Sequence, residues 1–301
     1  MTTKNWIRFC VLGLLWGSSF LWIKIAVSEI SPAMLVSFRA LFAAIGLAAV
    51  LIVSKTVKLK REQWKSAFFV FFLLGLFNVA LPIGVISWAE QYIDSGMASI
   101  LNSTVPLFTI IISPLFLKDD QLTFPKLAGL IVGFLGVVLI FSPDLGKGFS
   151  QNLAGQGAML LAALSYAGAG VYARVKTQEF SVQMQSFLQL FMATAIMWVF
   201  TFTIDRPLVF PTLPLTWIAL LWLGILGSCV ATLLFFQLLH SVGPTKTVLV
   251  TYVFPLVGVI LGAIFLQERL YWQALAGGVL IISGIVLVNM KTFPFRKPSG
   301  K

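Results

Sequence analysis

The stretch "MLVSFRALFAAIGLAAVLIV", Met34–Val53, is twenty residues long and contains a single charged side chain, that of Arg39. About twenty apolar residues are enough for an α-helix to cross the hydrocarbon core of a bilayer. A charged guanidinium near the centre of such a helix costs about 2.5–3.5 kcal/mol on insertion scales. The stretch therefore predicts a membrane-spanning helix whose arginine is retained for a partner or a ligand in the interior.

The whole chain has the composition of a polytopic membrane protein. Of its 301 residues, 59% are hydrophobic and 10% are charged, whereas soluble domains carry about 25% charged residues. The mean hydropathy is +0.97. Both cysteines, Cys10 and Cys229, lie in apolar runs, so no disulfide framework is expected. The first apolar run, residues 6–27, is too long for the core of a cleavable signal peptide and is followed by further spans.

Ten segments are long and apolar enough to be spanning helices, and the loops between them are short. The expected fold is therefore an all-α integral membrane protein without a soluble domain. The expected helices are residues 6–27, 32–53, 66–89, 95–117, 124–141, 155–175, 182–203, 215–239, 244–266 and 271–290.

Basic residues divide unequally between the two sides of this topology. Four lie on the side away from the N-terminus, namely Lys24, Lys147, Arg206 and Arg269. Sixteen lie on the N-terminal side, namely Lys4, Arg8, Lys55, Lys58, Lys60, Arg61, Lys65, Lys118, Lys126, Arg174, Lys176, Lys246, Lys291, Arg296, Lys297 and Lys301. The positive-inside rule then places both termini in the cytoplasm of a plasma (inner) membrane. The net charge of +11 reflects topology and contact with the lipid bilayer, not nucleic acid.

The chain also repeats itself weakly at an offset of about 150 residues. Glu29, Ser31 and Met34 recur as Glu179, Ser181 and Met184, and "NSTVPLF" around Pro106 resembles "TYVFPLV" around Pro255. Each half contains five helices, an odd number, so the halves are expected to cross the membrane in opposite directions. Inverted-topology repeats of this kind are typical of secondary transporters. The expected units are residues 1–145 and 150–291, followed by a basic cytoplasmic tail, 292–301.

Four stretches of the sequence resemble the drug/metabolite transporter superfamily, in its EamA-type ten-helix branch. They are "LLWGSSFLWIK" in the first helix, "SPAMLVSFRALFAA" in the second, "ISWAEQYIDSGMASILNSTVPLF" across helices three and four, and "GPTKTVLVTYVFPLVGVILGAIFLQERL" in helix nine. The resemblance implies two inverted five-helix repeats around a central cavity. It also implies transport, commonly export, of amino acids or other small metabolites. The second half has Gln189 where the first has Arg39.

Arg39, Glu90 and Lys24 are expected to lie at similar depths in the outer leaflet, because each is a few residues from the outer end of its helix. Intramembrane charges usually pair or face a water-filled cavity. Arg39 either binds an anionic substrate group, or is held by Glu90 until substrate or a proton displaces it. The alternatives are a fixed structural ion pair with Glu90 and no contact between the two side chains. Glu90 is the candidate for proton coupling, or else a solvated interfacial acid. Lys24 either lines the cavity or extends to the membrane surface.

Pro106 and Pro255 are expected near the middle of helices four and nine, in matching positions of the two halves. Proline removes a backbone hydrogen bond, and interrupted spans in matching positions indicate a binding site. We therefore predict hinges at both prolines. The polar neighbours are expected either to line the cavity or to bond to their own helices; they are Asn102, Ser103, Thr104, Thr251 and Tyr252.

Several other residues have defined expectations. Trp16 and Tyr166 are mid-span and related by the offset, so they either stack on a ligand in the cavity or pack in the core. Asp94 is expected to cap the fourth helix. Three G-x-x-x-G pairs are expected to pack helices within one chain, as a monomer or weak homodimer; they are Gly13/Gly17, Gly129/Gly133 and Gly258/Gly262.

These features favour a secondary carrier of small amphiphilic metabolites that works by alternating access, most directly an exporter of amino acids or related compounds. The alternative is an efflux carrier for drugs and organic cations with the same fold. An enzyme is disfavoured because the single histidine, His240, has no carboxylate near it in sequence and no hydrolase or metal motif occurs. No cofactor is expected, and no Walker A loop is present, so ATP does not drive transport directly. A channel or scaffold would not require paired mid-span prolines.

Overall fold

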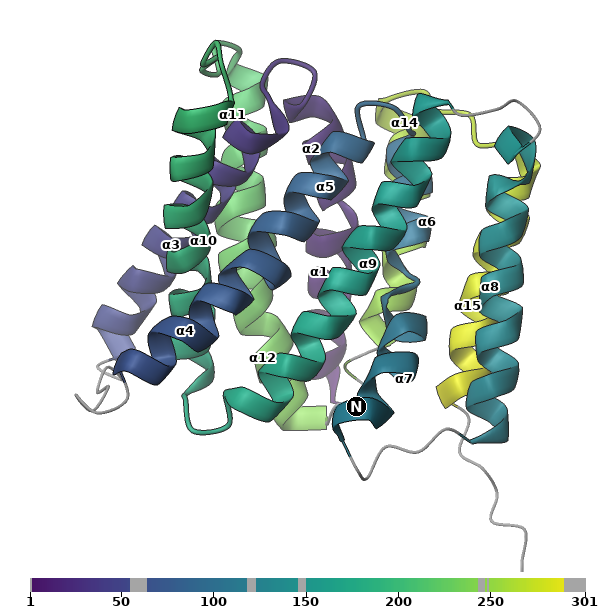
Figure 1. Ribbon diagram of the computed structural model, residues 1–301, viewed down its shortest axis with the longest axis horizontal. Helices are drawn as coiled ribbons and strands as arrows, with labels where there is room; N and C mark the ends of the chain where they lie inside the picture. Colours follow the sequence, from purple (N-terminus) through teal and green to yellow (C-terminus); the bar gives the residue numbers. More distant parts are fainter. Residues whose placement is uncertain are drawn as a thin grey trace, which may run out of the picture.

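The computed structural model describes residues 2–54, 64–117, 123–145, 150–242, 247 and 249–289, and the expected tail 292–301 lies outside this part. The described elements are all helical (Figure 1). They are α1 (Thr3–Gly17), α2 (Ser19–Ala26), α3 (Pro32–Ser54), α4 (Trp64–Gly75), η2 (Leu76–Ala80), α5 (Leu81–Ala89), α6 (Ser95–Asn102), α7 (Val105–Phe116), α8 (Phe124–Leu145), α9 (Gln151–Lys176), α10 (Val182–Ile204), α11 (Pro214–Leu221), η3 (Trp222–Val230), α12 (Ala231–Val242), η4 (Leu249–Tyr252), α14 (Val253–Phe265) and α15 (Trp272–Asn289).

These elements form the ten apolar spans that hydropathy predicts. Eight are long enough to cross a bilayer by length and composition, and the ninth and tenth, Val250–Phe265 and Trp272–Val288, are shorter apolar helices. A helix satisfies every backbone group within its own segment, which is why a chain of this composition spans as helices. The all-α membrane fold is confirmed, and the chain is a multi-pass membrane protein.

The chain begins and the last described helix ends at the same end of the molecule. In Figure 1 this is the lower end, where α1 starts and α15 finishes, and we call it the N-terminal end. The opposite end, which holds the loops after α2, α5 and α14, is called the far end. Helices α1 and α2 rise from the N-terminal end, whereas α9, which follows 150 residues later, descends towards it.

Contacts between helices match when the two halves are exchanged. Helix α5 packs on α9, and its counterpart α12 packs on α1; likewise α7 packs on α9, and α14 packs on α1. Helix α10 packs on α4 and η2, and α3 packs on η3. The remaining major pairs join equivalent spans directly, namely α3 with α10, α6 with α14, and α8 with α15. The middle of the molecule is thus built at an interface to which both halves contribute.

Five of the ten spans depart from a regular α-helix. The first is interrupted at Ser18, the fourth at Ser103–Thr104, and the ninth begins with the 3₁₀ segment η4. The third and eighth contain π-helical segments, η2 and η3, which fall at matching positions in the two halves. A π-helical turn holds an extra residue and is frequently found at functional sites. The irregular turns are therefore the first structural indication of where a ligand binds.

Both mid-span prolines lie just after an interruption rather than inside a continuous helix. Pro106 is the second residue of α7, and Pro255 is the third residue of α14. A proline in the first turn of a helix loses no intrahelical bond, because the N–H groups of that turn have no intrahelical partner. Each proline therefore marks the start of a second half-helix.

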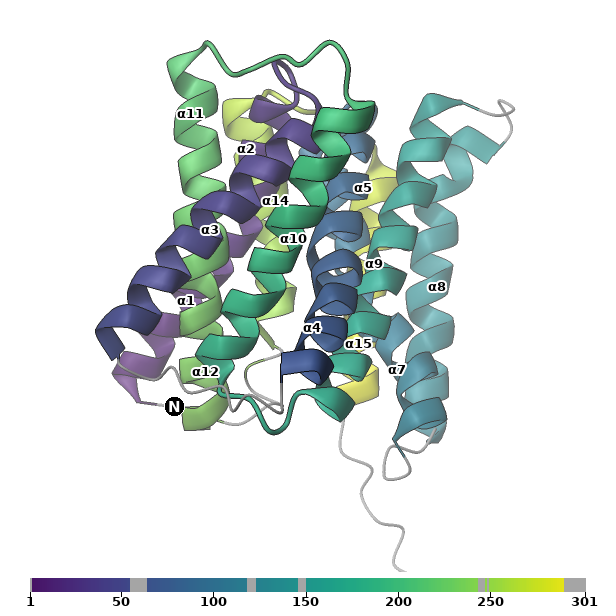
Figure 2. The same ribbon diagram turned by 60° about the vertical axis from the view of Figure 1, so that its left-hand side comes forward.

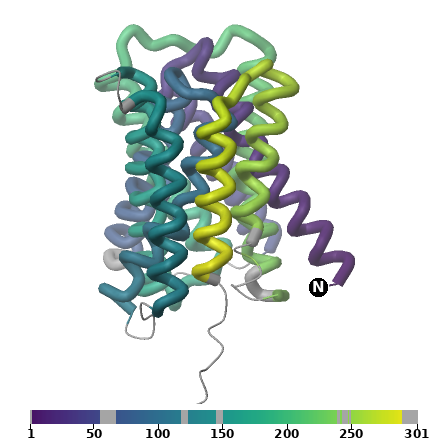
Figure 3. The backbone as a smooth tube through the Cα atoms, turned by 90° about the vertical axis from the view of Figure 1, so that its right-hand side faces the viewer, coloured from purple at the N-terminus to yellow at the C-terminus, as the bar shows by residue number. Residues whose placement is uncertain are grey.

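Glycines of the predicted G-x-x-x-G pairs pack helices within the chain. A methyl group added at Gly13 or Gly17 would lie 2.7 or 2.6 Å from Val253 or Val257 of α14. Helices α8 and α15 lie side by side along their whole length, at one side of the bundle (Figure 3). Backbones approach closely there, since a methyl group at Gly136 would lie 2.5 Å from the carbonyl oxygen of Gly277.

This contact predicts a clear difference between two glycine substitutions. Gly136→Ala forces α8 away from the α15 backbone, and overpacking of this kind costs about 1–3 kcal/mol. Gly168→Ala is the matched control, because no atom lies within 4 Å of the added methyl group; it is expected to be neutral or to stabilise by about 0.5–1 kcal/mol. Thermal unfolding in detergent measures both. Equal unfolding temperatures for the two variants would contradict the packing of α8 on α15.

Candidate substrate-binding site

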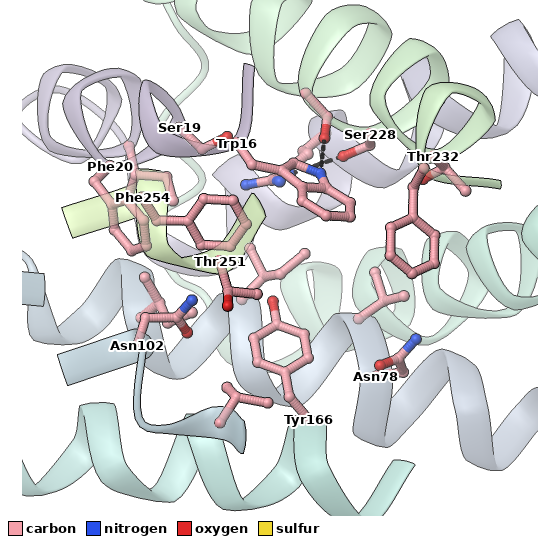
Figure 4. Close-up of a pocket in the computed structure, with 18 of the residues that line it drawn as sticks. Trp16, Ser19, Phe20, Asn78, Asn102, Tyr166, Ser228, Thr232, Thr251 and Phe254 are labelled. Atoms are coloured by element: carbon pink, nitrogen blue, oxygen red, sulfur yellow. Dashed lines mark hydrogen bonds between the residues drawn. The ribbon is translucent and has the colours of Figure 1, made fainter. Parts of the chain in front are cut away.

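A cavity of about 430 Å³ lies between the two halves, near the irregular turns (Figure 4). This volume is in the range of small-molecule sites, about 300–1,000 Å³. Its described lining consists of Trp16, Ser19, Phe20, Ile23, Arg39, Asn78, Val79, Ile83, Ile86, Asn102, Val105, Pro106, Tyr166, Gln189, Leu190, Gly227, Ser228, Thr232, Phe235, Phe236, Thr251 and Phe254. The wall is mostly apolar and aromatic, with a few polar groups from both halves.

Arg39 is the one charged side chain in this described lining. It projects from the third turn of α3 and is 8% exposed. Its Nε donates a hydrogen bond to Ser228 Oγ at 3.0 Å, in the π-helical segment η3 of the other half. Among the described residues, its two terminal amino groups have no hydrogen-bond partner. A guanidinium held in this way presents two parallel donors to the cavity, the geometry that binds a carboxylate bidentately.

A second polar pair occupies the matching position in the other half. Gln189, which takes the place of Arg39 in α10, accepts a hydrogen bond at 3.0 Å from Asn78 Nδ2 of η2. Asn78 and Ser228 are themselves 150 residues apart. Each pair therefore joins the second span of one half to the π-helical turn of the other. One side of the cavity carries a fixed positive charge, and the equivalent side is neutral and polar.

Aromatic side chains surround these polar groups. Trp16 donates from Nε1 to the backbone oxygen of Gly227 at 3.1 Å, and its ring lies 5.5 and 5.6 Å from the rings of Phe235 and Phe254. Figure 4 shows Tyr166 pointing towards Trp16 and Thr251 across the same space. Aromatic walls of this kind suit the apolar part of a small amphiphilic ligand.

The interrupted fourth span reaches the cavity at its break. Asn102, the last residue of α6, lines the cavity together with Val105 and Pro106 of α7. The buried Oδ1 atom of Asn102 has no hydrogen-bond partner among the described residues. Non-helical backbone at membrane depth is tolerated where it lines a cavity, and unpaired groups at such a break are available to a ligand.

Half of the predicted cavity residues reach the cavity, and half lie elsewhere. Those in the lining are Arg39, Trp16, Tyr166, Asn102 and Thr251, and Pro106 of the expected hinges joins them. Those outside it are Glu90, Ser103, Thr104, Tyr252 and Lys24, together with Pro255.

Local bonds explain where these other residues lie. The hydroxyls of Ser103 and Thr104 donate to the carbonyl oxygens of Ile100 and Leu101 in their own helix, at 2.6 and 2.7 Å. Tyr252 packs against the main hydrophobic core.

Arg39 and Glu90 do not form the ion pair that one interpretation of the sequence expected. Arg39 bonds to Ser228, and both carboxylate oxygens of Glu90 are buried without a hydrogen-bond partner in the described part of the chain. The two side chains still influence each other electrostatically. Sequence depth along each helix predicted their proximity but not the directions in which the side chains point.

The cavity is followed by a second one towards the N-terminal end. This cavity has a volume of about 670 Å³ and is lined by Arg8, Ser181, Gln183, Gln237, Ser241 and neighbouring residues. A single side chain, Phe236, borders both cavities. Polar groups therefore extend from the N-terminal end to the edge of the central cavity.

At the far end, polar contacts join segments that are distant in sequence. Lys24 Nζ donates to the backbone oxygens of Glu90 and of Ile93, the latter at 2.8 Å. Ser31 of the first half donates its hydroxyl to the Asp205 carboxylate of the second. Rings close the same region, with Trp22 and Trp222 centred 5.4 Å apart. Polar and aromatic contacts therefore join the two halves at this end.

Two glutamates act as helix caps from a distance. Glu29 Oε1 accepts hydrogen bonds from the Thr212 and Leu213 amides, at 2.5 and 3.0 Å, just before α11. Glu268 accepts from the Ser95 and Gly96 amides at the start of α6, at 2.8 and 3.0 Å. Both carboxylates satisfy N-terminal amides that have no intrahelical partner.

The expectation that Asp94 caps the fourth helix is wrong. Asp94 occupies the N-cap position, but its side chain makes no cap hydrogen bond. Glu268, contributed by the other half, already takes the amides that Asp94 would have bonded.

Comparison with known proteins agrees with this geometry. A sequence model described as the EamA-like transporter family matches the chain twice, over residues 5–142 and 153–290. The chain belongs to the EamA-like transporter family. Each half carries one complete match, and the cavity lies between them.

Two relatives that this EamA-like transporter matches over most of their length are named as transporters. The chain is 26% identical to "Uncharacterized transporter YoaV" of Bacillus subtilis, covering 94% of this chain and 96% of the relative. It is 28% identical to "Uncharacterized inner membrane transporter YedA" of Escherichia coli K12, covering 94% and 90%. A solved crystal structure shares the fold with a TM-score of 0.66 at 18% identity, covering 95% and 96% of the two chains. The protein is thus a membrane transporter of this family.

The contacts of Glu29 predict how the far end responds to acid. The hydroxyls of Thr212 and Thr216, together with the Thr212 and Leu213 amides, lower the Glu29 pKa from 4.5 to about 2. Because the folded pKa is below the unfolded one, the contribution of Glu29 to stability is present above pH 4.5 and is lost as pH falls towards 2.

Thr212→Val removes the hydroxyl donor, so the Glu29 pKa is expected to rise towards 4.5. Carboxyl ¹³C NMR of glutamate-labelled protein measures this pKa directly. Thr203→Val is the matched control, since the Thr203 hydroxyl bonds only within α10. A wild-type Glu29 that titrates near 4.5 would show that these bonds are not formed.

Proposed function

We propose that this protein is a secondary carrier that moves small amphiphilic carboxylates, such as amino acids or related metabolites, by alternating access. The observation that carries the proposal is Arg39, which lines a cavity between the halves: Ser228 anchors its Nε, while its terminal amino groups have no hydrogen-bond partner in the described part of the chain. A charged side chain is costly to place within the membrane, so Arg39 is expected to bind a ligand of opposite charge.

A carboxylate fits this site better than other anions of similar size. Its two oxygens match the two free donors of the guanidinium, and charge-assisted bonds of this type contribute about 1.5–3 kcal/mol each. The rings of Trp16, Phe20 and Phe254 supply an apolar surface for the rest of the molecule. Asn102 and the Asn78–Gln189 pair offer polar groups for an amino or hydroxyl substituent.

An organic cation is the alternative ligand, and the charge of the cavity argues against it. Aromatic rings would attract a cation through their π faces. However, the charged group in the described lining is positive, and a like charge in a dry site raises the energy of a bound cation. The cation-efflux alternative therefore has less support than a carboxylate carrier.

The halves are proposed to be inverted repeats that rock against each other, with units 1–145 and 150–291. Three observations support this arrangement: two family matches, helix contacts that are matched between halves, and opposite directions of α1–α2 and α9. Transporters built in this way alternate access by moving one repeat against the other around a fixed site. The interruptions before Pro106 and Pro255 are the proposed hinges.

The state described by the structure is proposed to be open towards the cytoplasm. The far end is held shut by Lys24, Ser31 and the paired tryptophans, and a second cavity lies on the N-terminal side. The distribution of basic residues favours cytoplasmic termini, and the relative YedA is named as an inner membrane protein. We propose a plasma-membrane exporter that takes its substrate from the cytoplasm.

Counterflow in proteoliposomes with three matched compounds tests both the carrier and the charge preference. L-Leucine, its carboxylate analogue 4-methylpentanoate and its amine analogue 3-methylbutylamine differ only in the charged groups. We expect trans-acceleration with the two carboxylates and none with the amine. Uptake without trans-acceleration would indicate a channel, and exchange of the amine alone would favour the cation alternative.

Substitution of Arg39 extends the same experiment. Arg39→Gln, which copies Gln189, is expected to weaken carboxylate binding about 10–100-fold through loss of charge-assisted bonds. Arg39→Lys retains the charge without the planar guanidinium, so its carboxylate affinity is expected to lie between those of wild type and Arg39→Gln. Arg206→Gln at the exposed far end is the matched control. A folded Arg39→Gln variant with wild-type affinity would remove Arg39 from the site.

A further inference from the structure

Glu90 is a buried carboxyl group that the proposed site does not use. It follows α5 directly and is 0% exposed, yet neither carboxylate oxygen has a hydrogen-bond partner among the described residues. The hydroxyl of Ser87, three residues earlier, is also buried without a partner. Buried carboxylates are normally paired or bonded, so Glu90 stands out from every other acidic side chain described.

The charged groups around Glu90 already bond to other atoms. Lys24 of α2 donates to the backbone oxygens of Glu90 and Ile93, not to the carboxylate. Arg39 of α3 bonds to Ser228. Glu268, from the loop after α14, accepts bonds from the α6 amides. All three act on Glu90 electrostatically.

Among the described residues, the remaining neighbours of Glu90 do not supply a counter-charge. Helix α9, which also packs on α5, brings the neutral Gly155 against the carbonyl oxygen of Ala89 and the side chains of Tyr92 and Ile93. Asp94 interacts electrostatically with both Glu268 and Lys24, and its carboxylate carries the same sign of charge as that of Glu90.

A carboxyl group in such a place is far easier to bury with its proton than without it, because the protonated form is neutral. We propose that Glu90 is a proton-binding site separate from the substrate cavity, loaded while the far end is shut and emptied when that end opens. The inference rests on the proposed carrier function and adds a proton as the second transported species.

Lys24 provides the link between proton release and opening. When the far end opens, its ammonium leaves the carbonyl oxygens and water reaches Glu90. The O–H bond of the carboxyl group breaks, the proton passes to that water, and the carboxylate left behind can pair with Lys24. The far end closes with that pair in place; a proton from the N-terminal side then binds Glu90, and Lys24 returns to the carbonyl oxygens. Because the Lys24 ammonium alternates between the carbonyl oxygens and the Glu90 carboxylate, proton release from Glu90 is coupled to opening of the far end.

Infrared spectroscopy of the full-length protein in liposomes tests the site without any substrate. We expect a protonated carboxyl C=O band at neutral pH that shifts when glutamate is ¹³C-labelled and disappears in Glu90→Gln. Glu179→Gln, at an exposed position, is the matched control and is expected to keep the band. Glu90→Asp is the second variant, used if Glu90→Gln does not fold. Its carboxyl C=O band is expected to remain but no longer to shift when glutamate is ¹³C-labelled. A spectrum unchanged by both Glu90 substitutions would overturn the proposal.

The coupling is tested by imposing a pH difference on proteoliposomes and measuring the net accumulation of labelled L-leucine. At one proton per substrate, one pH unit can drive about tenfold accumulation; we expect this in wild type and none in Glu90→Gln. Wild-type exchange that ignores the pH difference would refute the proton site alone. Failure of the carrier function is recognised separately, as absence of counterflow in wild type with the infrared band still present.

Discussion

The hydrogen bond from Arg39 Nε to Ser228 Oγ is the interaction on which the site depends. A guanidinium inside a membrane protein has to be partly satisfied by protein, or the helix that carries it would not insert well. A single anchor at Nε meets this need and still leaves the two terminal donors to a ligand. The anchor lies in a π-helical turn of the opposite half, so the bond also ties the two halves together across the cavity.

The same arrangement, without the charge, recurs between Gln189 and Asn78. Two related halves have therefore kept a cross-interface pair while only one pair holds a charge. This makes the cavity electrostatically one-sided, although the helices around it are matched. The far-end contacts are also built across the interface, through Ser31–Asp205 and Glu29 with Thr212. Ligand recognition and closure thus involve the same pair of surfaces, which is what a rocking motion requires.

Sequence reasoning predicted the ten spans because each must supply about twenty apolar residues, a signal that is local and strong. It also predicted Arg39 as a cavity residue, because Arg39 is the one charged residue in an apolar span. It did not find Ser228, Gln189 or Asn78 as lining residues, although the 150-residue offset relates Gln189 to Arg39 and Ser228 to Asn78. Neutral polar residues in a span are common, so this signal is weak until the contacts are known.

Long-range geometry accounts for the other differences. The cap of α6 comes from Glu268, which is 173 residues away from Ser95, and no local pattern could have replaced Asp94 with it. Depth along a helix placed Lys24, Glu90 and Arg39 near one another, but rotation about the helix axis decides that only Arg39 faces the described cavity. The most direct test of the central claim, alternating access, is to bridge Ser31→Cys and Asp205→Cys with a short bifunctional thiol reagent, in a Cys10→Ser, Cys229→Ala background. The account predicts that bridging abolishes carboxylate counterflow, that reduction restores it and that each single cysteine is harmless; exchange at the unbridged rate would contradict it.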